Sequence, residues 1–497
     1  ASALIANGVH LVGRSFKYHR PRGFFGVGVD EPYAIVQLYR NGETDPNCRA
    51  TEQELFEGLE AKSINCFPSV NFDLGAINNF LNRFFPAGFY YKTFMWPKSF
   101  WYRIYEPFIR RAAGFGVASK DHDKERYEHK YEYCDLLVAG SGPSGLASAY
   151  AAAKNGANVI LAEDKPRFGG SLLTSDVNIG NQTGKDWAGK IVAELKAMPN
   201  VIVKNRSQVF GYYDHNMLVM SERISDHLPK SKKYTPKQRL WYIRSKEVII
   251  SSGSIERPII FGNNDTPGVV LASAAREYLK VYGVLFGKKP LIFTNNDSAY
   301  ETAIEFKKNG ILPIVLDSRA NPSSEIINEA KNLGIDIKFS HVVVAAKGYK
   351  KVKSADIAKI SKDKQNLEEI KNIKCDCICV SGFWTPTIHL ASQSGNKTKF
   401  NEDIDAFVPN KPKQKETTLG SANGVFTLEE TLKTSFEAGT KISKKITNKE
   451  NTIPIPQVSE KKNSKHDKFW CVPLPKGKIY KRFLDFQNDV TVSDIEL

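Results

Sequence analysis

Gly140-Ser-Gly142-Pro-Ser-Gly145 constrains the fold of this chain more than any other segment. An apolar strand, Leu136–Ala139, precedes the glycines, a helix of small residues follows them, and the next strand ends at Glu163. Glycines at this spacing let a strand turn sharply, let the backbone approach a pyrophosphate and let the helix pack against the strand. The phosphates then lie at the helix N-terminus, where free N–H groups and the helix dipole favour an anion. The segment predicts a nucleotide-binding α/β domain.

Glu163 narrows the choice of nucleotide. A carboxylate about twenty residues after the glycine turn accepts hydrogen bonds from the 2′-hydroxyl of an adenosine ribose, which argues against a 2′-phosphate. NAD or FAD therefore fits this site, whereas NADP does not. The alternative is a tight strand–helix turn that binds no nucleotide.

A second strand–helix–strand unit spans residues 289–317, and repeated units of this kind imply parallel sheets. Its turn reads Thr294-Asn-Asn-Asp-Ser-Ala299 and contains no glycine. Cβ atoms thus occupy the place of closest phosphate approach, and Asp297 adds a charge that repels phosphate. We expect one nucleotide per chain, held by the first unit.

Two further segments are candidates for contacts with the same nucleotide. Gly169-Gly170-Ser171 is typical of a loop that passes close to the nucleotide in flavoproteins with two dinucleotide domains, although a plain loop turn is the alternative. The strand Val248–Ser254 includes Ser252 and Gly253 near its end and resembles the segment that returns the chain to the nucleotide. An ordinary buried strand explains this second segment equally well.

Length and composition limit the class of protein. The 497 residues exceed the size of one core, which stops growing near about 250–300 residues. The formal charge of +16 lacks an accompanying nucleic-acid-binding motif, so a basic surface explains it best. The chain has no apolar run long enough to span a membrane and no signal peptide, and its seven cysteines are too few for a disulfide scaffold. We expect a cytoplasmic protein that binds neither membrane nor nucleic acid.

No residue spacing indicates a metal site or a catalytic side chain. Cys375, Cys377 and Cys379 alternate along a strand, which places their thiols in a row and favours a buried strand over a tetrahedral metal site. The nine histidines show neither metal-ligand nor triad spacing. We expect no metal ligand and no catalytic residue in this chain.

The regions outside the α/β units have distinct patterns. A strand over residues 34–39 followed by Asn41-Gly42 predicts a hairpin. Residues 80–108 contain thirteen aromatic side chains, which indicate either a core or, as we favour, an interface with another chain. Residues 449–468 have the composition of a linker.

Both ends suggest a fragment of a longer polypeptide. Residues 1–7 predict a helix that Gly8 ends. Ser493 and Glu496 have the spacing of a capping box, so we expect a helix to begin there.

Seven sequence blocks, spread over nearly the whole chain, carry a resemblance to a known family. They are GRSFKYHRPRG (13–23), PAGFYYKTFMWP (86–97), YEPFIRRAAGFG (105–116), GSGPSGLASA (140–149), NNDTPGVVLASAAREYL (263–279), VSGFWTPTIHLASQS (380–394) and DFQNDVT (485–491). In these blocks the chain resembles the α subunits of heterotetrameric sarcosine oxidases.

The resemblance implies an α/β fold, with a glutathione-reductase-like pair of dinucleotide-binding domains with parallel sheets preceded by a partial ferredoxin-like (β-grasp) domain. The expected domains are a partial ferredoxin-like domain (1–72), an aromatic-rich connector (73–130), a discontinuous NAD-binding domain (131–284 and 371–448), a degenerate dinucleotide-fold domain (285–370), and a linker with the start of a truncated C-terminal region (449–497). Residues 24–30 stand where relatives with a [2Fe–2S] cluster carry cysteines, and Cys48 and Cys66 are too few for four ligands. The first domain should therefore hold no cluster.

The resemblance also implies cofactors, partners and contact residues. NAD should lie in this chain, FMN at the interface with the β subunit, tetrahydrofolate in a C-terminal half beyond residue 497, and FAD in the β subunit, while the γ and δ subunits complete the complex. Asn423 stands where many flavoproteins carry an aspartate, which weakens an assignment of FAD to this chain. The expected NAD contacts are Gly140, Gly142, Pro143, Ser144, Gly145, Glu163, Asp164, Lys165, Gly170, Ser171, Val209, Ser252, Gly253, Ala422, Asn423, Leu428 and Glu430.

The function that the resemblance implies is oxidative demethylation of sarcosine to glycine, with the one-carbon unit passed to tetrahydrofolate. The amine would be oxidised mainly at the β subunit, so this chain does not fix the substrate. One alternative is a related amine dehydrogenase that acts on N-methylglutamate or an opine. Another is a scaffold subunit in which NAD is structural.

Overall fold

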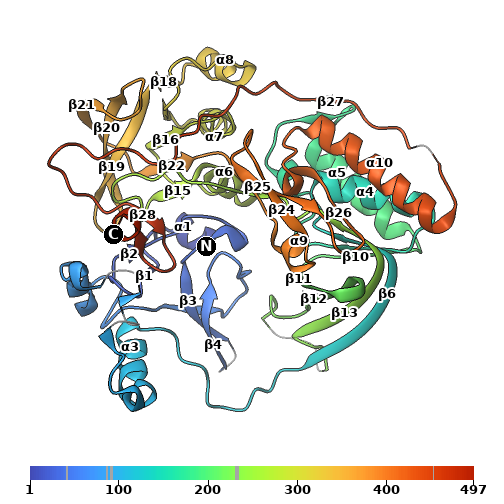
Figure 1. Ribbon diagram of the computed structural model, residues 1–497, viewed down its shortest axis with the longest axis horizontal. Coiled ribbons are helices and arrows are strands. Elements are labelled where there is room, and N and C mark those ends of the chain that lie inside the picture. Colours follow the sequence, from blue (N-terminus) through green and yellow to red (C-terminus); the bar gives the residue numbers. More distant parts are fainter. Residues whose placement is uncertain (41–42, 86–87, 90–92, 230–233, 452, 497) are drawn as a thin grey trace. The chain divides into compact units, whose positions relative to one another are not determined.

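The computed structural model describes residues 1–40, 43–85, 88–89, 93–229, 234–451 and 453–496 (Figure 1). The chain forms two compact units. Unit 1 contains residues 1–123, 257–383 and 462–497, and unit 2 contains residues 124–256 and 384–461. Among the described residues, no helix has the length and apolar character needed to cross a membrane.

Unit 2 is built on a mixed sheet whose parallel strands are β10, β7, β6, β13 and β26. The antiparallel strands β11 and β12 extend it from β13. Buried aliphatic residues dominate the second half of β6 and the end of β13, as expected for strands covered on both faces. The strands are β6 Tyr127–Ala139, β7 Val159–Ala162, β10 Val201–Lys204, β11 Ser207–Tyr213, β12 Met217–Arg223, β13 Gln238–Ile250 and β26 Glu416–Thr418.

Helices α4 (Pro143–Lys154), α5 (Gly184–Ala197) and α10 (Leu428–Thr447) lie together in this unit (Figure 1). α10 packs tightly on α4, because a Cβ added at Gly439 would lie 2.3 Å from the carbonyl oxygen of Ser148. The shorter elements are η6 Gly170–Leu173, β8 Asn178–Ile179, β9 Gln182–Thr183, η7 Asp214–Asn216, β14 Ser254–Glu256, β23 Trp384–Pro386, α9 His389–Gln393, β24 Lys397–Asn401, β25 Ala406–Lys411, η8 Gly420–Asn423 and β27 Val458–Ser459.

Unit 1 contains a five-stranded parallel sheet in the order β15-β22-β16-β17-β18. A three-stranded antiparallel sheet, β19-β20-β21, follows β18 in the chain. The elements are β15 Val269–Leu271, α6 Ala272–Tyr282, β16 Pro290–Thr294, α7 Ser298–Lys308, β17 Ile314–Asp317, α8 Glu325–Asn332, β18 Asp336–Phe339, β19 His341–Gly348, β20 Val352–Ile360, β21 Leu367–Ile373 and β22 Cys377–Ser381.

The boundaries expected for the second α/β domain differ from those observed. Residues 257–284 and 371–383 belong to unit 1, although the sequence assigned them to the NAD-binding domain. The physical reason is strand pairing, since β22 lies between β15 and β16 in one sheet. Cys377 and Cys379 are buried in β22, as the alternation predicted.

The first part of unit 1 has the strands expected of a ferredoxin-like domain. β3 pairs antiparallel with both β4 and β5, which confirms the predicted hairpin strands, while Asn41 and Gly42 lie outside the described residues. The predicted N-terminal helix is α1. The elements are α1 Ser2–Ala6, β1 Gly13–Arg14, β2 Pro21–Arg22, η1 Gly28–Asp30, β3 Ile35–Arg40, β4 Glu43–Arg49 and β5 Glu60–Ser63.

The aromatic segment, residues 80–108, forms short helical turns. Four of its rings, Phe85, Phe89, Phe94 and Tyr105, contact one another in sequence. The side chains of Phe80, Phe84, Trp96, Tyr102 and Phe108 are between 67% and 83% exposed. The elements of this region are η2 Leu74–Asn79, η3 Asn82–Phe84, η4 Lys98–Phe100, the π-helix η5 Trp101–Tyr105 and α3 Glu106–Ala113.

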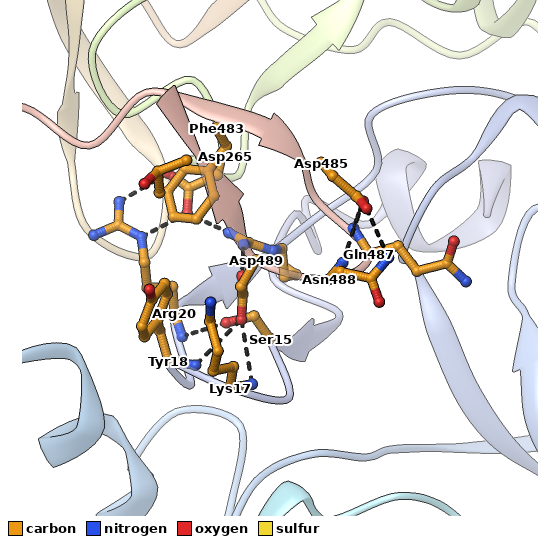
Figure 2. Close-up of polar contacts among 12 residues, drawn as sticks. Ser15, Lys17, Tyr18, Arg20, Asp265, Phe483, Asp485, Gln487, Asn488 and Asp489 are labelled. Carbon is orange, nitrogen blue, oxygen red and sulfur yellow. Dashed lines mark hydrogen bonds and ion pairs between the residues drawn. The ribbon is translucent and has the colours of Figure 1, made fainter. Parts of the chain in front are cut away.

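The C-terminal segment is tied into unit 1 by a buried ionic cluster (Figure 2). Asp489 accepts hydrogen bonds from the backbone N–H groups of Lys17 and Tyr18, each at 3.2 Å, and pairs with Arg22. Arg22 also pairs with Asp265, which Arg20 contacts at 2.6 Å. The cluster therefore joins the ferredoxin-like part, the loop before β15 and the C-terminal segment of the same unit.

Two expectations about the C-terminal region are wrong. The capping box is formed by Thr491 and Asp494, so helix α11 (Val492–Ile495) begins before Ser493. The reason is that β29 (Val490–Thr491) pairs with β28 (Phe483–Asp485) and ends at Thr491, directly before the helix. Residues 449–468 are also more than a linker, because β27 pairs with β8.

Candidate nucleotide-binding site

The candidate site lies where the parallel strands of unit 2 end. Ala139, the last residue of β6, is paired with Ala162 of β7 on one side and with Ile250 of β13 on the other. Ile250 is in turn paired with Thr418 of β26. The residues that follow these four strands therefore meet at one edge of the sheet, the place where open α/β sheets bind ligands.

Gly140 and Gly145 are required by packing within the protein. Gly140 has a φ of 102°, and a Cβ added there would lie 2.3 Å from the carbonyl oxygen of Ser251. A Cβ at Gly145 would lie 1.9 Å from the carbonyl oxygen of Gly140. The hydroxyl of Ser251 donates to the carbonyl oxygens of Ala139 and Gly140, both at 2.9 Å, and so holds the turn.

Gly142 differs, because nothing in the protein requires a glycine there. Its φ of −65° and ψ of −175° suit any L-residue, and no heavy atom lies within 4 Å of the position of an added Cβ. The residue caps the N-terminus of α4, and Pro143 follows in the first turn. The open space beside Gly142 at a helix N-terminus has the form of a cradle that a side chain would fill and an anion would occupy.

Glu163 lies beside this turn. One carboxylate oxygen accepts hydrogen bonds from the backbone N–H of Ser141 at 2.9 Å and its hydroxyl at 2.5 Å, and the other accepts from the N–H of Lys165 at 3.0 Å. Burial and the neighbouring carboxyl of Asp164 raise the pKa of Glu163 well above its ordinary range. The N–H and O–H groups of Ser141 and the N–H of Lys165 thus use three of the about four acceptor positions of this carboxyl group, and the side chain of Asp164 also contacts it.

The loop with Gly170 and Ser171 is brought to the same turn. A Cβ added at Gly170, whose φ is 53°, would lie 2.8 Å from Cα of Gly142. The backbone N–H of Gly169 donates to the carbonyl oxygen of Ser141 at 3.1 Å. The loop therefore lies against the glycine turn, and Ser171, the second residue of η6, is exposed. That the loop passes close to a nucleotide stays a prediction.

Ser252 and Gly253 follow β13 at the same edge. The Ser252 hydroxyl donates to the carbonyl oxygen of Thr387 at 2.8 Å, and Gly253 has a φ of 79°. Val209 lies in β11 and packs against the core beneath the sheet. β11 contacts the end of β7 through Ser207, whose backbone N–H donates to the carbonyl oxygen of Glu163 at 2.7 Å.

The last predicted contacts divide into two groups. Ala422 and Asn423 lie in η8, whose Gly420 approaches the start of α4 so closely that an added Cβ would be 2.8 Å from Oγ of Ser144. Leu428 and Glu430 have other neighbours. The side chain of Leu428 enters the core, and its N–H donates to Glu460 at 2.6 Å, while Glu430 is exposed on α10.

Sequence reasoning missed Ser141, Ser251 and Gly420, which hold the turn in place. Small residues directly after a strand were the only signal for Ser251, and nothing in the sequence marks Gly420 as a neighbour of Ser144.

Comparison with known proteins places this geometry in a family. Residues 1–66 match the family model of 2Fe-2S iron-sulfur cluster binding domains, and residues 135–209 match that of FAD dependent oxidoreductases. The alpha subunit of sarcosine oxidase from Rhizobium meliloti (strain 1021) is 40% identical over 505 residues, which cover 100% of this chain and 49% of that protein. The chain is a homologue of the alpha subunit of sarcosine oxidase. This confirms the resemblance carried by the seven blocks.

The chain spans about half the length of the sarcosine oxidase relatives that it matches. The A subunit of opine oxidase from Agrobacterium tumefaciens (strain Ach5) is 28% identical over 174 residues, a third of each chain. The crystal structure of L-proline dehydrogenase from P. horikoshii aligns with 99% of this chain and 79% of that chain, with a TM-score of 0.60 and 17% identity. The sarcosine oxidase homologue thus has the predicted α/β dinucleotide-binding fold with a ferredoxin-like domain.

The ferredoxin-like domain of this sarcosine oxidase homologue does not fit an iron–sulfur cluster. A [2Fe–2S] cluster needs four ligands, usually thiolates, and residues 1–66 contain only Cys48 and Cys66. In the described part of the chain, no three His, Cys, Asp or Glu residues are grouped for a metal ion. Residues 1–66 thus match the model of this domain but supply two cysteines where a cluster needs four.

Proposed function

We propose that this chain is the NAD-binding part of the α subunit of a flavoenzyme that oxidatively demethylates sarcosine to glycine. The observation that carries the proposal is Gly142. Its missing side chain is required neither by the backbone nor by packing, and the preceding residue, Ser141, donates its N–H to Glu163. A bound pyrophosphate explains that glycine.

NAD is proposed rather than FAD because Asn423 stands where many flavoproteins carry an aspartate. Gly140–Gly145 would hold the pyrophosphate, Glu163 the adenosine ribose, and Ser171 and Ala422 the rest of the nucleotide. NAD, when bound, supplies a hydride acceptor. FAD is the competing ligand, because residues 135–209 match a family of FAD dependent oxidoreductases.

Extraction of the bound nucleotide tests this proposal. We expect one NAD per chain, lost in Gly142→Val because the branched side chain would fill the pyrophosphate path. Gly189→Val is the matched control, since Gly189 also has nothing within 4 Å of an added Cβ but lies on the exposed side of α5. Recovery of FAD, or retention of NAD by Gly142→Val, would refute the assignment.

The proposed substrate rests on the homology with sarcosine oxidase subunits. In this proposal the one-carbon unit passes to tetrahydrofolate, FMN lies between this chain and a β subunit, and FAD lies in the β subunit. The similarity to the A subunit of opine oxidase favours one alternative, an amine dehydrogenase that acts on N-methylglutamate or an opine. Turnover of sarcosine, N-methylglutamate and opines by the complete complex distinguishes them, and a preference for the latter two excludes the first.

A structural role for NAD is the competing possibility within the same complex. The turn Thr294–Ala299 has no glycines, and the sequence contains no Cys-x-x-Cys motif of the kind typical of redox-active pairs. NADH formation that follows amine turnover in the purified complex would exclude a purely structural NAD.

The exposed rings of the aromatic segment are the proposed surface for the β subunit, and γ and δ subunits complete the proposed complex. Contiguous exposed apolar side chains usually mark a protein interface. Trp96→Ala and Trp101→Ala should each weaken assembly by about 2–4 kcal/mol if both are central anchors. Leu312→Ala, at an exposed residue elsewhere in unit 1, is the control. Normal assembly of the tryptophan variants with the β subunit would refute this surface.

A further inference from the structure

The second α/β fold, in unit 1, holds a segment of its own chain where a nucleotide phosphate would lie. The backbone N–H and hydroxyl of Ser464 donate to the carboxylate of Asp297, at 2.6 and 2.7 Å, directly before α7. The N–H of Asp467 donates to the carbonyl oxygen of Asn295 at 2.9 Å, and the Asn295 amide donates back to the Asp467 carbonyl oxygen at 2.8 Å. The turn between β16 and α7 is therefore occupied.

Arg319 fastens this segment from the neighbouring strand. Its guanidinium contacts Asp297 at 2.8 Å and Asp317 at 2.7 Å, and it donates to the hydroxyl of Ser464 at 2.8 Å. Both carboxylates are buried and share this one arginine, and hydrogen bonds from the Tyr300 hydroxyl to Asp317 and from Ser464 to Asp297 meet their other oxygens. A dinucleotide has no path across this turn, because its pyrophosphate would have to displace the segment.

A cavity of about 300 Å³ remains open beside the segment, at the carboxyl ends of β17 and β18. Ser318, Ala320 and Ser340 line it from the strand ends, and Lys362 and Lys465 line it from the two loops opposite. This is the edge at which open parallel sheets take ligands, and the volume is at the lower end of that of small-molecule sites.

The polar groups of this cavity favour an anion. No partner for the ammonium groups of Lys362 and Lys465 is found among the described residues, whereas Lys364 pairs with Asp467. Ser318 is only 3% exposed, and its buried hydroxyl has no hydrogen-bond partner within the described part of the chain. Asp467 also lines the cavity, but its carboxylate is paired with Lys364, so the two lysine charges remain to match the oxygens of a phosphate group.

We propose that this cavity binds a phosphate monoester no larger than a mononucleotide. The two lysines supply the charge and donate hydrogen bonds to the phosphate oxygens. The segment Ser464–Asp467 sets the size limit, because it fills the adjoining position of a second phosphate. The proposal concerns unit 1 and does not depend on which nucleotide unit 2 holds.

Lysine acetylation of the full-length protein, mapped by mass spectrometry, tests the site directly. We expect AMP and inorganic phosphate to protect Lys362 and Lys465, with a Kd of about 1 mM or below for AMP. Lys353, exposed on β20, should not be protected. Protection by phosphate but not by AMP would limit the ligand to a smaller phosphate ester. Absence of protection by either compound at about 10 mM, or equal protection by succinate, would overturn the proposal.

A double variant, Lys362→Gln with Lys465→Gln, provides an independent measurement. Calorimetric titration should show at least tenfold weaker AMP binding at this site. The titrations of wild type and of the double variant use protein whose unit 2 site is saturated with the nucleotide that co-purifies, so that AMP reports the cavity alone. Affinity unchanged in the double variant would refute the assignment.

Discussion

Asp489→Asn should destabilise unit 1 by about 3 kcal/mol, because it removes one of two carboxylates from a buried cluster (Figure 2). The Asp489 side chain is 0% exposed and pairs with Arg22, which Asp265 also contacts. Breaking a buried ion pair costs about 3–5 kcal/mol. The lower value applies here, because Arg22 keeps Asp265 and the amide oxygen of the variant can still accept from Lys17 and Tyr18.

The backbone should not add to this cost. Asp489 has a φ of 53°, a conformation that asparagine adopts readily. Asp485→Asn is the matched control from the same segment, since its carboxylate accepts from the N–H groups of Gln487 and Asn488, at 2.7 and 3.2 Å, near the surface (Figure 2). An asparagine can make the same turn, so we expect a loss below about 1 kcal/mol.

Hydrogen exchange measures the effect where it arises. Because a chain of two units need not unfold in one step, the amides of Lys17 and Tyr18 are better reporters than a global melting temperature. A loss of about 3 kcal/mol corresponds to exchange about 100-fold faster. If Asp489→Asn leaves their protection within about threefold of that in Asp485→Asn, the cluster does not stabilise the unit as argued.

Burial alone would raise the pKa of Asp265, but its two arginine partners outweigh burial and lower it from 3.8 to about 2. The stability that this carboxylate adds is present above pH 4 and is lost between about pH 4 and pH 2, by up to ~2.5 kcal/mol. Urea unfolding of wild type and of Asp265→Asn at each pH measures this loss. Burial and the adjacent carboxyl raise the pKa of Glu163. Wild type without nucleotide should therefore lose stability as the pH rises above about 4.5, whereas Glu163→Gln, which cannot ionise, should not. If the melting temperatures of the two proteins change in parallel across this pH range, the argument is wrong. Gly439→Ala should cost about 1–3 kcal/mol in chemical unfolding because its Cβ meets a carbonyl oxygen of α4, while Gly189→Ala on exposed α5 should gain up to about 1 kcal/mol.

Local sequence signals were sufficient where the structure depends on neighbours in the chain. The glycine turn, the helix after it and the strand ending at Glu163 are present as expected, because backbone conformation and hydrophobic spacing are encoded within a few residues. The pairing of β3 with β4 follows from the same kind of signal. The buried cysteine strand β22 does too.

The extent of each unit depended on contacts between distant residues. Placing β22 between β15 and β16 joins residues about a hundred positions apart, and no periodicity records which strands will be neighbours. The same holds for residues 464–467. Their polar composition indicated a linker, yet the buried carboxylate of Asp297 takes Ser464 as a hydrogen-bond partner.

The sequence by itself determined that this chain contains a strand–glycine turn–helix unit with an acidic residue at the next strand end, since these features are local. Only the tertiary structure separated the roles of the three glycines. Gly140 and Gly145 are glycines because carbonyl oxygens of the protein lie against them, whereas Gly142 faces open space. That distinction depends on the ends of β6 and β13 lying side by side, and it is the reason we propose Gly142 as the residue beside a bound nucleotide.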